Sequence, residues 1–202
     1  MATPHTPRFT ARLPRRTHAS AGAPTDALST AAVREAVVAG LRITLGFVFL
    51  WAFLDKAFGL GYATKAGNGW VEGGSPTEGF LSHVEVGPMA STLRGWAGEA
   101  WADWLFMAGL LGIGAAVVLG VGLRIAAVSG TAMMALMWIA EWPPAKHTES
   151  GAATMSTNPF ADYHLVYALA LIALAAVAAG SRYGLGERWA ALPAVRRNSW
   201  LR

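Results

Sequence analysis

Four long apolar stretches constrain the fold of this chain more than any other feature of its sequence. They cover residues 36–58, 104–123, 125–142 and 162–180. A helix that crosses a lipid bilayer needs about 20 mostly apolar residues, and each stretch comes close to that length. Only 14% of the residues are charged, against about 25% in an ordinary soluble domain. We therefore predict an all-α fold: an integral membrane four-helix bundle with a long outer loop between the first and second helices.

The regions that flank the apolar stretches set the predicted domain boundaries. Residues 1–28 contain several prolines and no apolar periodicity, a pattern that opposes a continuous helix. We predict a disordered basic arm over residues 1–28, a four-span membrane domain over residues 29–185 and a basic cytoplasmic tail over residues 186–202. A cap at Ser29 or Thr30 would begin the first helix near Ala31.

Arginine residues collect in three places that lie on the same side of a four-span chain. These are the N-terminal arm, the turn at Arg124 and the C-terminal tail, whereas the loops on the other side are mainly acidic. Cytoplasmic loops carry an excess of Lys and Arg, so we predict a multi-pass protein of the plasma membrane with both termini in the cytoplasm. Basic flanks of apolar segments indicate contact with an anionic lipid bilayer, and we predict no nucleic-acid partner.

The absence of cysteine excludes several kinds of redox chemistry. Without thiolates the chain cannot ligate an iron–sulfur cluster through cysteine, attach haem c or form a disulfide. None of the histidines lies in the middle of a span, which argues against a haem with two axial histidines. His83, His147 and His164 lack the spacing of a zinc site, so we predict no metal. Redox chemistry would then need a quinone, a flavin or a partner subunit.

Small residues recur at intervals of four along the second and third spans. They are Ala108, Gly112, Ala116 and Gly120 in the second span, and Ala126 and Gly130 in the third. Small residues let membrane helices approach closely. We therefore predict that these two faces form a tight central hairpin, and that Gly112→Leu loosens it.

Polar residues near the outer ends of the spans are candidates for a functional site, because charges inside a membrane are costly and are usually functional. The predicted orientation brings Glu141, Asp162 and His164 to a similar depth, and we predict that they handle protons. Asp162 has a second interpretation, as an acidic residue that stabilises the first turn of its helix.

Six further residues are predicted to bind a substrate or a quinone headgroup: Arg42, Trp51, Asp55, Lys56, Asn158 and Tyr167. Arg42 and Lys56 are the candidate ligands for an anion. Arg42 has a second interpretation, in which its side chain extends to the cytoplasmic lipid headgroups. Adjacent residues point about 100° apart on a helix, so either Asp55 or Lys56 is expected to face the inside of the bundle.

Two segments of the chain resemble the DoxX/DoxD family of membrane proteins. They are Leu41-Arg42-Ile43-Thr44-Leu45-Gly46-Phe47-Val48-Phe49-Leu50 with the following Asp55-Lys56, and Asn158-Pro159-Phe160-Ala161-Asp162-Tyr163-His164. The resemblance implies a small four-helix subunit of respiratory electron transfer. The long outer loop is more similar to the DoxD branch, which resembles the membrane subunit of thiosulfate:quinone oxidoreductase. The sequence contains no domain that resembles the small partner subunit, and the candidate residues above rest on their own chemistry.

These observations favour a membrane subunit of a quinone-linked oxidoreductase, with quinone as the electron acceptor. The subunit would work with a partner redox subunit or as a homo-oligomer. A second hypothesis is a non-catalytic scaffold that docks a soluble redox or stress-response enzyme to the membrane. A third hypothesis is a small-solute transporter. It is less favoured, because the four predicted spans show neither the inverted repeat nor the broken helices common in that class.

Overall fold

The structure, a computed structural model, describes the backbone of residues 23–180 and 182–201, and the side chains from residue 30 onward in those ranges. This part of the chain is helical and contains no strand apart from an isolated β-bridge between His147 and Ala153. Its longest helices are α1 (Ala23–Phe58), α4 (Ala100–Leu119), α5 (Leu123–Glu141) and α6 (Tyr163–Ala176). The predicted all-α class is confirmed for the described residues.

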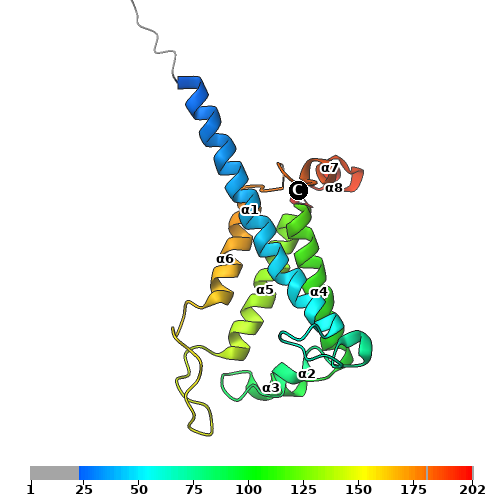
Figure 1. The fold of residues 1–202 in the computed structure, drawn as a ribbon, viewed down its shortest axis with the longest axis vertical. Coiled ribbons are helices and arrows are strands. Elements are labelled where there is room, and N and C mark those ends of the chain that lie inside the picture. The colour runs from blue at the N-terminus through cyan, green and yellow to red at the C-terminus, as the bar shows by residue number, and fades with distance from the viewer. Residues whose placement is uncertain (1–22, 181, 202) are drawn as a thin grey trace, which may run out of the picture.

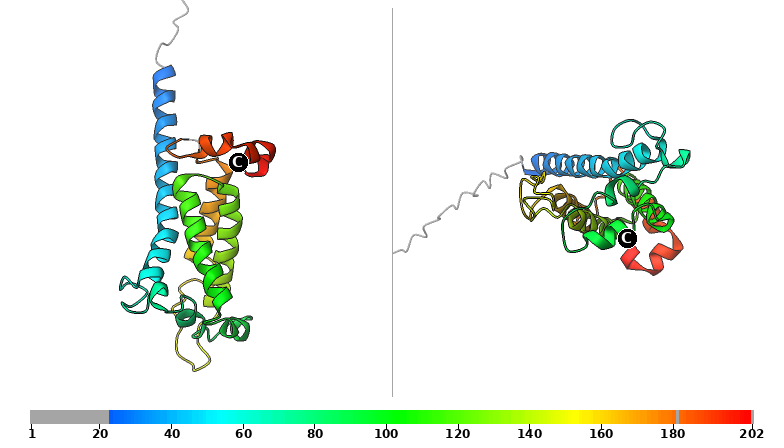
Figure 2. Two further views of the ribbon diagram at one scale, coloured as in Figure 1. Left: turned by 90° about the vertical axis from the view of Figure 1, so that its right-hand side faces the viewer. Right: turned by 90° about the horizontal axis from the view of Figure 1, so that it is seen from below.

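The long helices lie side by side around one apolar core (Figures 1 and 2). α1 packs along α4, α5 packs along α6, and α4 and α5 join the two pairs. Met107, Val117 and Leu171 are among the most deeply buried side chains of that core. Large apolar side chains such as Leu105, Val128 and Leu169 cover the outside and are more than half exposed. An outer surface of this kind suits lipid as the solvent.

Three helices of the described chain are long and apolar enough to cross a membrane. They are the part of α1 over Thr30–Phe58, together with α4 and α5. The helix α6 has 14 residues and is about 21 Å long at about 1.5 Å per residue, which is less than the ~30 Å of a hydrocarbon core. The chain leaves the helix at Val177 and turns at Ala178, whose φ is 49°. The apolar helices therefore indicate a membrane protein, and the fourth span stays a prediction.

The first helix begins earlier than the sequence indicated. We expected a cap at Ser29 or Thr30, but α1 starts at Ala23 and runs for 36 residues. Residues 23–28, which we placed in the disordered arm, are therefore helical. The first turns of α1 project beyond the other helices (Figure 1). The rest of the predicted arm, residues 1–22, lies outside the described residues.

The predicted role of Gly112 in the packing of α4 against α5 is wrong. Gly112 is exposed, and a Cβ atom added there would meet no atom within 4 Å. The predicted residue Gly130 does lie against α4, since a Cβ there would be 3.4 Å from Cγ2 of Ile113, but the close approach of two backbones lies between α1 and α4. A Cβ at Gly46 would lie 2.7 Å from the amide nitrogen of Val118, and one at Gly114 would lie 2.8 Å from that of Leu50. The glycines of the second span occupy two faces of the helix, and the face that carries Gly114 meets the partner helix.

The long connections lie at one end of the helices, which we call the loop end (Figure 1). Between α1 and α4 they include the short helices η1 (Trp70–Glu72), α2 (Glu78–Leu81) and α3 (Ala90–Gly95). Asp103 ties this connection to α4, because one of its carboxylate oxygens accepts hydrogen bonds from the hydroxyls of Ser75 and Thr77 at 2.9 and 2.6 Å. The connection from α5 to α6 lies at the same end.

The opposite end, which we call the tail end, carries α7 (Gly186–Ala191), α8 (Pro193–Arg197) and η2 (Ser199–Leu201) (Figure 2). Trp189 donates from its ring nitrogen to the carbonyl oxygen of Leu201 at 2.6 Å, which folds this segment onto itself. Arg182 pairs with Glu35 of α1, and this hydrogen bond raises the pKa of the Arg182 guanidinium above its usual value. The chain that leads into the tail is therefore linked to α1 at Glu35, in the first half of that helix.

Candidate functional site

A cluster of polar side chains lies at the loop end, where α5 ends and α6 begins. The Nδ1 atom of His164 lies 2.8 Å from Oδ2 of Asp162 and 4.0 Å from Oε2 of Glu141. The hydroxyl of Tyr163 donates to Oε1 of Glu141 at 2.6 Å. We call these four residues the His164 cluster. It unites the three predicted proton-handling residues in one place.

The local sequence explains how the cluster forms. Asp162 is the N-cap of α6, and its Oδ1 atom accepts from the amide nitrogens of His164 and Leu165. One carboxylate thereby caps the helix and leaves its other oxygen for the imidazole, so the interpretation of Asp162 as an acid at the helix start is confirmed and its role in proton handling stays a prediction. A carboxylate only accepts hydrogen bonds, so the hydrogen-bond network assigns the proton to Nδ1.

Asn158 shapes the chain that leads into this cap. Its side-chain oxygen accepts from the amide nitrogens of Phe160 and Ala161, both at 3.0 Å. Trp138 of α5 donates from its ring nitrogen to the carbonyl oxygen of Phe160 at 3.0 Å. The predicted ligand Asn158 therefore acts on the turn, since its side chain is used within that turn and is exposed.

The side chains of the His164 cluster differ in how far they are exposed. The side chain of His164 is 1% exposed, that of Asp162 is 15% exposed and that of Glu141 is 36% exposed. Tyr163 is half exposed, and its ring lies 5.9 Å from that of Tyr167, in an edge-to-face arrangement. A chain of ionisable groups thus runs from the surface to a buried imidazole.

The hydrogen bonds described so far leave out the far nitrogen of that imidazole. Nε2 of His164 is buried and makes no hydrogen bond within the described residues. Buried polar atoms are nearly always hydrogen-bonded, and an unpaired buried group costs about 1–3 kcal/mol. Within the described residues, Nε2 is therefore the atom of the cluster whose hydrogen-bonding capacity is unused, as are Nε of Arg42 and Oγ1 of Thr131 elsewhere in the protein.

The same residues could also contact a cation. Glu141, Asp162 and His164 each offer a ligand atom, and these atoms lie within 4.8 Å of one another. This set differs from the histidines considered in the sequence, because His83 bonds to Ser82 and Gly79 within its own turn. The hydrogen bonds from His164 to Asp162 and from Tyr163 to Glu141 explain why these side chains lie close together, and no ion is needed to hold them.

Arg42 lies far from the His164 cluster, and its side chain binds backbone carbonyls. It is 0% exposed and sits at the tail end. One of its terminal nitrogens donates to the carbonyl oxygens of Val117 and Val118, at 2.9 and 2.5 Å, and the other donates to that of Tyr183, at 2.6 Å. These carbonyls end α4 and follow α6. The side chain therefore reaches neither lipid headgroups nor the loop end, and it is not brought together with the other predicted ligands.

Asp55 also binds backbone. Its two carboxylate oxygens accept from the amide nitrogens of Tyr62, Ala63 and Thr64 at 2.8–3.2 Å, and it is 2% exposed. Trp51 packs edge-to-face on Tyr62 at 5.1 Å. These predicted ligands fold the chain after α1, and no hydrogen bond or ion pair among the described residues joins them to the His164 cluster.

Lys56, next to Asp55, is half-buried and makes no hydrogen bond or ion pair with a described residue. Figure 1 shows α1 and α6 diverging toward the loop end, where α1 ends just after Lys56 and α6 begins just before His164. The prediction that one of the adjacent pair faces inward agrees with the deep burial of Asp55.

Tyr163 is the member of the cluster that our sequence analysis did not propose as a site residue. Its position beside His164 was the only available signal, because its partner Glu141 belongs to another helix. No family model, no curated protein and no solved structure matches this chain.

Proposed function

We propose that this protein is the membrane subunit of a quinone-linked oxidoreductase similar to thiosulfate:quinone oxidoreductase. In this proposal the His164 cluster exchanges protons with a quinone headgroup at the loop end. The observation that carries it is the imidazole of His164, which is 1% exposed, is held by Asp162 on one nitrogen and is unpaired on the other. An imidazole has two ring nitrogens, so it can accept a proton on one nitrogen while it donates from the other.

The hydrogen bonds of the cluster support a defined direction for the proton. Asp162 accepts from Nδ1, so in the neutral ring Nε2 is the acceptor. A protonated ring donates from Nε2 to a quinone oxygen as two electrons arrive from a partner subunit, which takes them from two thiosulfate ions as these join into one tetrathionate. Glu141 and Tyr163, which are more exposed, then return a proton from water. Each reduced quinone takes up two protons, so the ring passes through this cycle twice.

Lys56 supports the binding of an anionic electron donor. Its ammonium group is half-buried beside a carboxylate whose oxygens are already occupied by backbone amides. An ammonium without a fixed partner is suited to a dianion such as thiosulfate. The separation from His164 assigns the two residues to different steps, anion capture and proton exchange.

We also propose that the chain crosses the plasma membrane four times, with both termini in the cytoplasm. The apolar residues 177–179 follow the ~21 Å of α6 as a turn, and local thinning of the bilayer accommodates a short span at modest cost. The arginine-rich tail and the start of α1 lie at the same end of the helices (Figure 1), which fits the excess of basic residues on the cytoplasmic side.

The test is thiosulfate-driven reduction of decylubiquinone by membranes that contain the full chain and any partner that purifies with it. We compare His164→Gln with His83→Gln, a change to an exposed loop histidine. Loss of a positioned proton donor costs about 100-fold or more in rate, so the first variant should lose activity and the second should keep it. A wild-type rate in a folded His164→Gln protein would refute the role of the cluster.

An inactive wild-type protein that purifies with a soluble enzyme would instead favour the scaffold hypothesis. Uptake of solute by proteoliposomes would favour the transporter. We place quinone chemistry first because an imidazole held by a carboxylate on one nitrogen and unpaired on the other is suited to proton exchange, which a passive scaffold does not need.

A further inference from the structure

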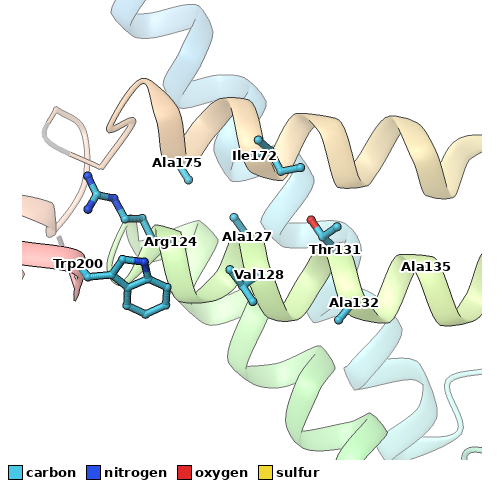
Figure 3. A pocket seen from close by; sticks show the side chains of 9 residues that line it. All are labelled: Arg124, Ala127, Val128, Thr131, Ala132, Ala135, Ile172, Ala175 and Trp200. Carbon is cyan, nitrogen blue, oxygen red and sulfur yellow. The ribbon is translucent and has the colours of Figure 1, made fainter.

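An apolar groove runs along the outside of α5 and α6, near the tail end (Figure 3). Its volume is about 540 Å³. Small side chains on the two helices leave the space, and larger ones border it. The lining residues are Arg124, Ala127, Val128, Thr131, Ala132, Ala135, Ile172, Ala175 and Trp200. The groove is separate from the His164 cluster, which lies at the opposite end of α6.

The length of the groove identifies the kind of molecule that fits it. On α5 it extends from Arg124 to Ala135, which corresponds to about 16 Å along the helix axis. This is about half of the ~30 Å hydrocarbon thickness of a bilayer, or the depth of one leaflet. One acyl chain of a lipid needs only this half.

The charge at the tail end of the groove identifies the headgroup. Figure 3 shows the side chains of Arg124 and Trp200 at that end of the groove. Arg124 donates one hydrogen bond, at 3.1 Å, to the carbonyl oxygen of Ser199, and a guanidinium has five N–H donors in all. α5 begins at Leu123, so the positive end of its helix dipole lies at the tail end of the groove, beside Arg124. Its N-cap residue, Gly122, has no side chain to cap the first amides. Trp200 contributes a ring of the kind found at membrane interfaces.

We propose that this groove binds an anionic phospholipid. One acyl chain lies between α5 and α6, and the phosphate is held by Arg124 at the start of α5. A zwitterionic lipid with the same acyl chains gains less from the site, because its headgroup carries a compensating cation. The proposal is independent of the quinone chemistry at the loop end.

The experiment uses the full chain, purified in detergent and stripped of lipid. Dioleoyl phosphatidylglycerol and dioleoyl phosphatidylcholine are added in turn, and bound lipid is counted by native mass spectrometry while Tm is recorded. We expect one tightly bound phosphatidylglycerol, a rise in Tm with that lipid and weaker retention of phosphatidylcholine. Equal retention of the two lipids would overturn the proposal.

Two pairs of variants locate the site. Arg124→Gln should lower phosphatidylglycerol affinity about fivefold, since each basic residue near an anionic surface contributes about 1 kcal/mol. Arg188→Gln, an exposed change in α7, is the control and should not change it. Ala132→Phe should fill the groove and remove the bound lipid, whereas Ala108→Phe on the exposed side of α4 should not.

Each variant is first checked for a Tm close to that of the lipid-free wild type. Unchanged lipid binding by both folded Arg124→Gln and folded Ala132→Phe would refute the site. Displacement of the lipid by excess decylubiquinone would also refute it, since the groove would then hold the quinone. Conversion of a dimer to a monomer by Ala132→Phe would identify a second copy as the occupant and overturn the proposal.

Discussion

The guanidinium of Arg42 donates a hydrogen bond of 2.6 Å to the carbonyl oxygen of Tyr183, a residue 141 positions further along the chain. Tyr183 adopts a positive φ of 54°, a conformation that is costly for a residue with a side chain. The same guanidinium binds the carbonyls of Val117 and Val118. Arg42 therefore joins α1, the end of α4 and the segment after α6.

We expect Arg42→Gln to destabilise the protein strongly. Three backbone carbonyls would lose a charged donor, and unsatisfied buried acceptors cost about 1–3 kcal/mol each. Thermal unfolding in detergent measures the effect, with Arg34→Gln as the control, because Arg34 is an exposed arginine of the same helix. If both variants unfolded at the wild-type temperature, Arg42 would not hold these segments together.

The close contact of α1 with α4 makes a second prediction. Gly114→Ala would place a methyl group 2.8 Å from the amide nitrogen of Leu50, and overpacking of this kind typically costs about 1–3 kcal/mol. Gly112→Ala, two residues earlier, meets nothing within 4 Å and should be neutral or slightly stabilising. Tm values of the two proteins in the same detergent decide the matter, and equal losses would contradict the packing described above.

Asp162 allows its structural and chemical roles to be separated. Asparagine caps helices about as well as aspartate, whereas alanine loses about 1 kcal/mol. Asp162→Asn should therefore keep the stability of α6, and Asp162→Ala should not. Both variants should reduce quinone at least about tenfold more slowly, because the imidazole loses its carboxylate. Full activity in Asp162→Asn would show that the charge beside His164 is not needed.

The absence of cysteine gives a clean test of the four-span orientation. Ser150→Cys places a thiol in the exposed connection between α5 and α6, and Ser199→Cys places one in the exposed tail. A membrane-impermeant maleimide should label position 150 on intact cells and position 199 only after permeabilisation. The reverse pattern, or labelling of both on intact cells, would contradict the proposed orientation.

Hydropathy was sufficient to find the apolar helices, because lipid exposure requires a long apolar run whatever the helix packs against. It was not sufficient to find the tight helix pair. Gly112 and Gly114 are two residues apart on the same helix, and only the position of α1 shows which of them is in contact. Contacts between helices depend on rotation about each axis, which a repeat of small residues leaves open.

The contacts of the candidate site that are local in sequence could be predicted, whereas those between helices could not. His164 and Asp162 are two residues apart, so a helix cap was enough to bring them together. The bond from Tyr163 to Glu141 depends on how α5 and α6 pair. Arg42 and Asp55 were expected to bind a ligand because they are charges near a span. They bind backbone carbonyls and amides instead, and the sequence does not show where those groups will lie.

The central claim is that a quinone headgroup binds at His164. The most direct measurement is photolabelling of the protein in lipid nanodiscs with an azido-substituted ubiquinone, followed by peptide mapping. We predict that the label concentrates on peptides containing Glu141 and residues 162–167, that excess decylubiquinone removes it, and that His164→Gln weakens it. Label spread evenly over the lipid-facing helices, or label that excess quinone does not displace, would contradict the claim.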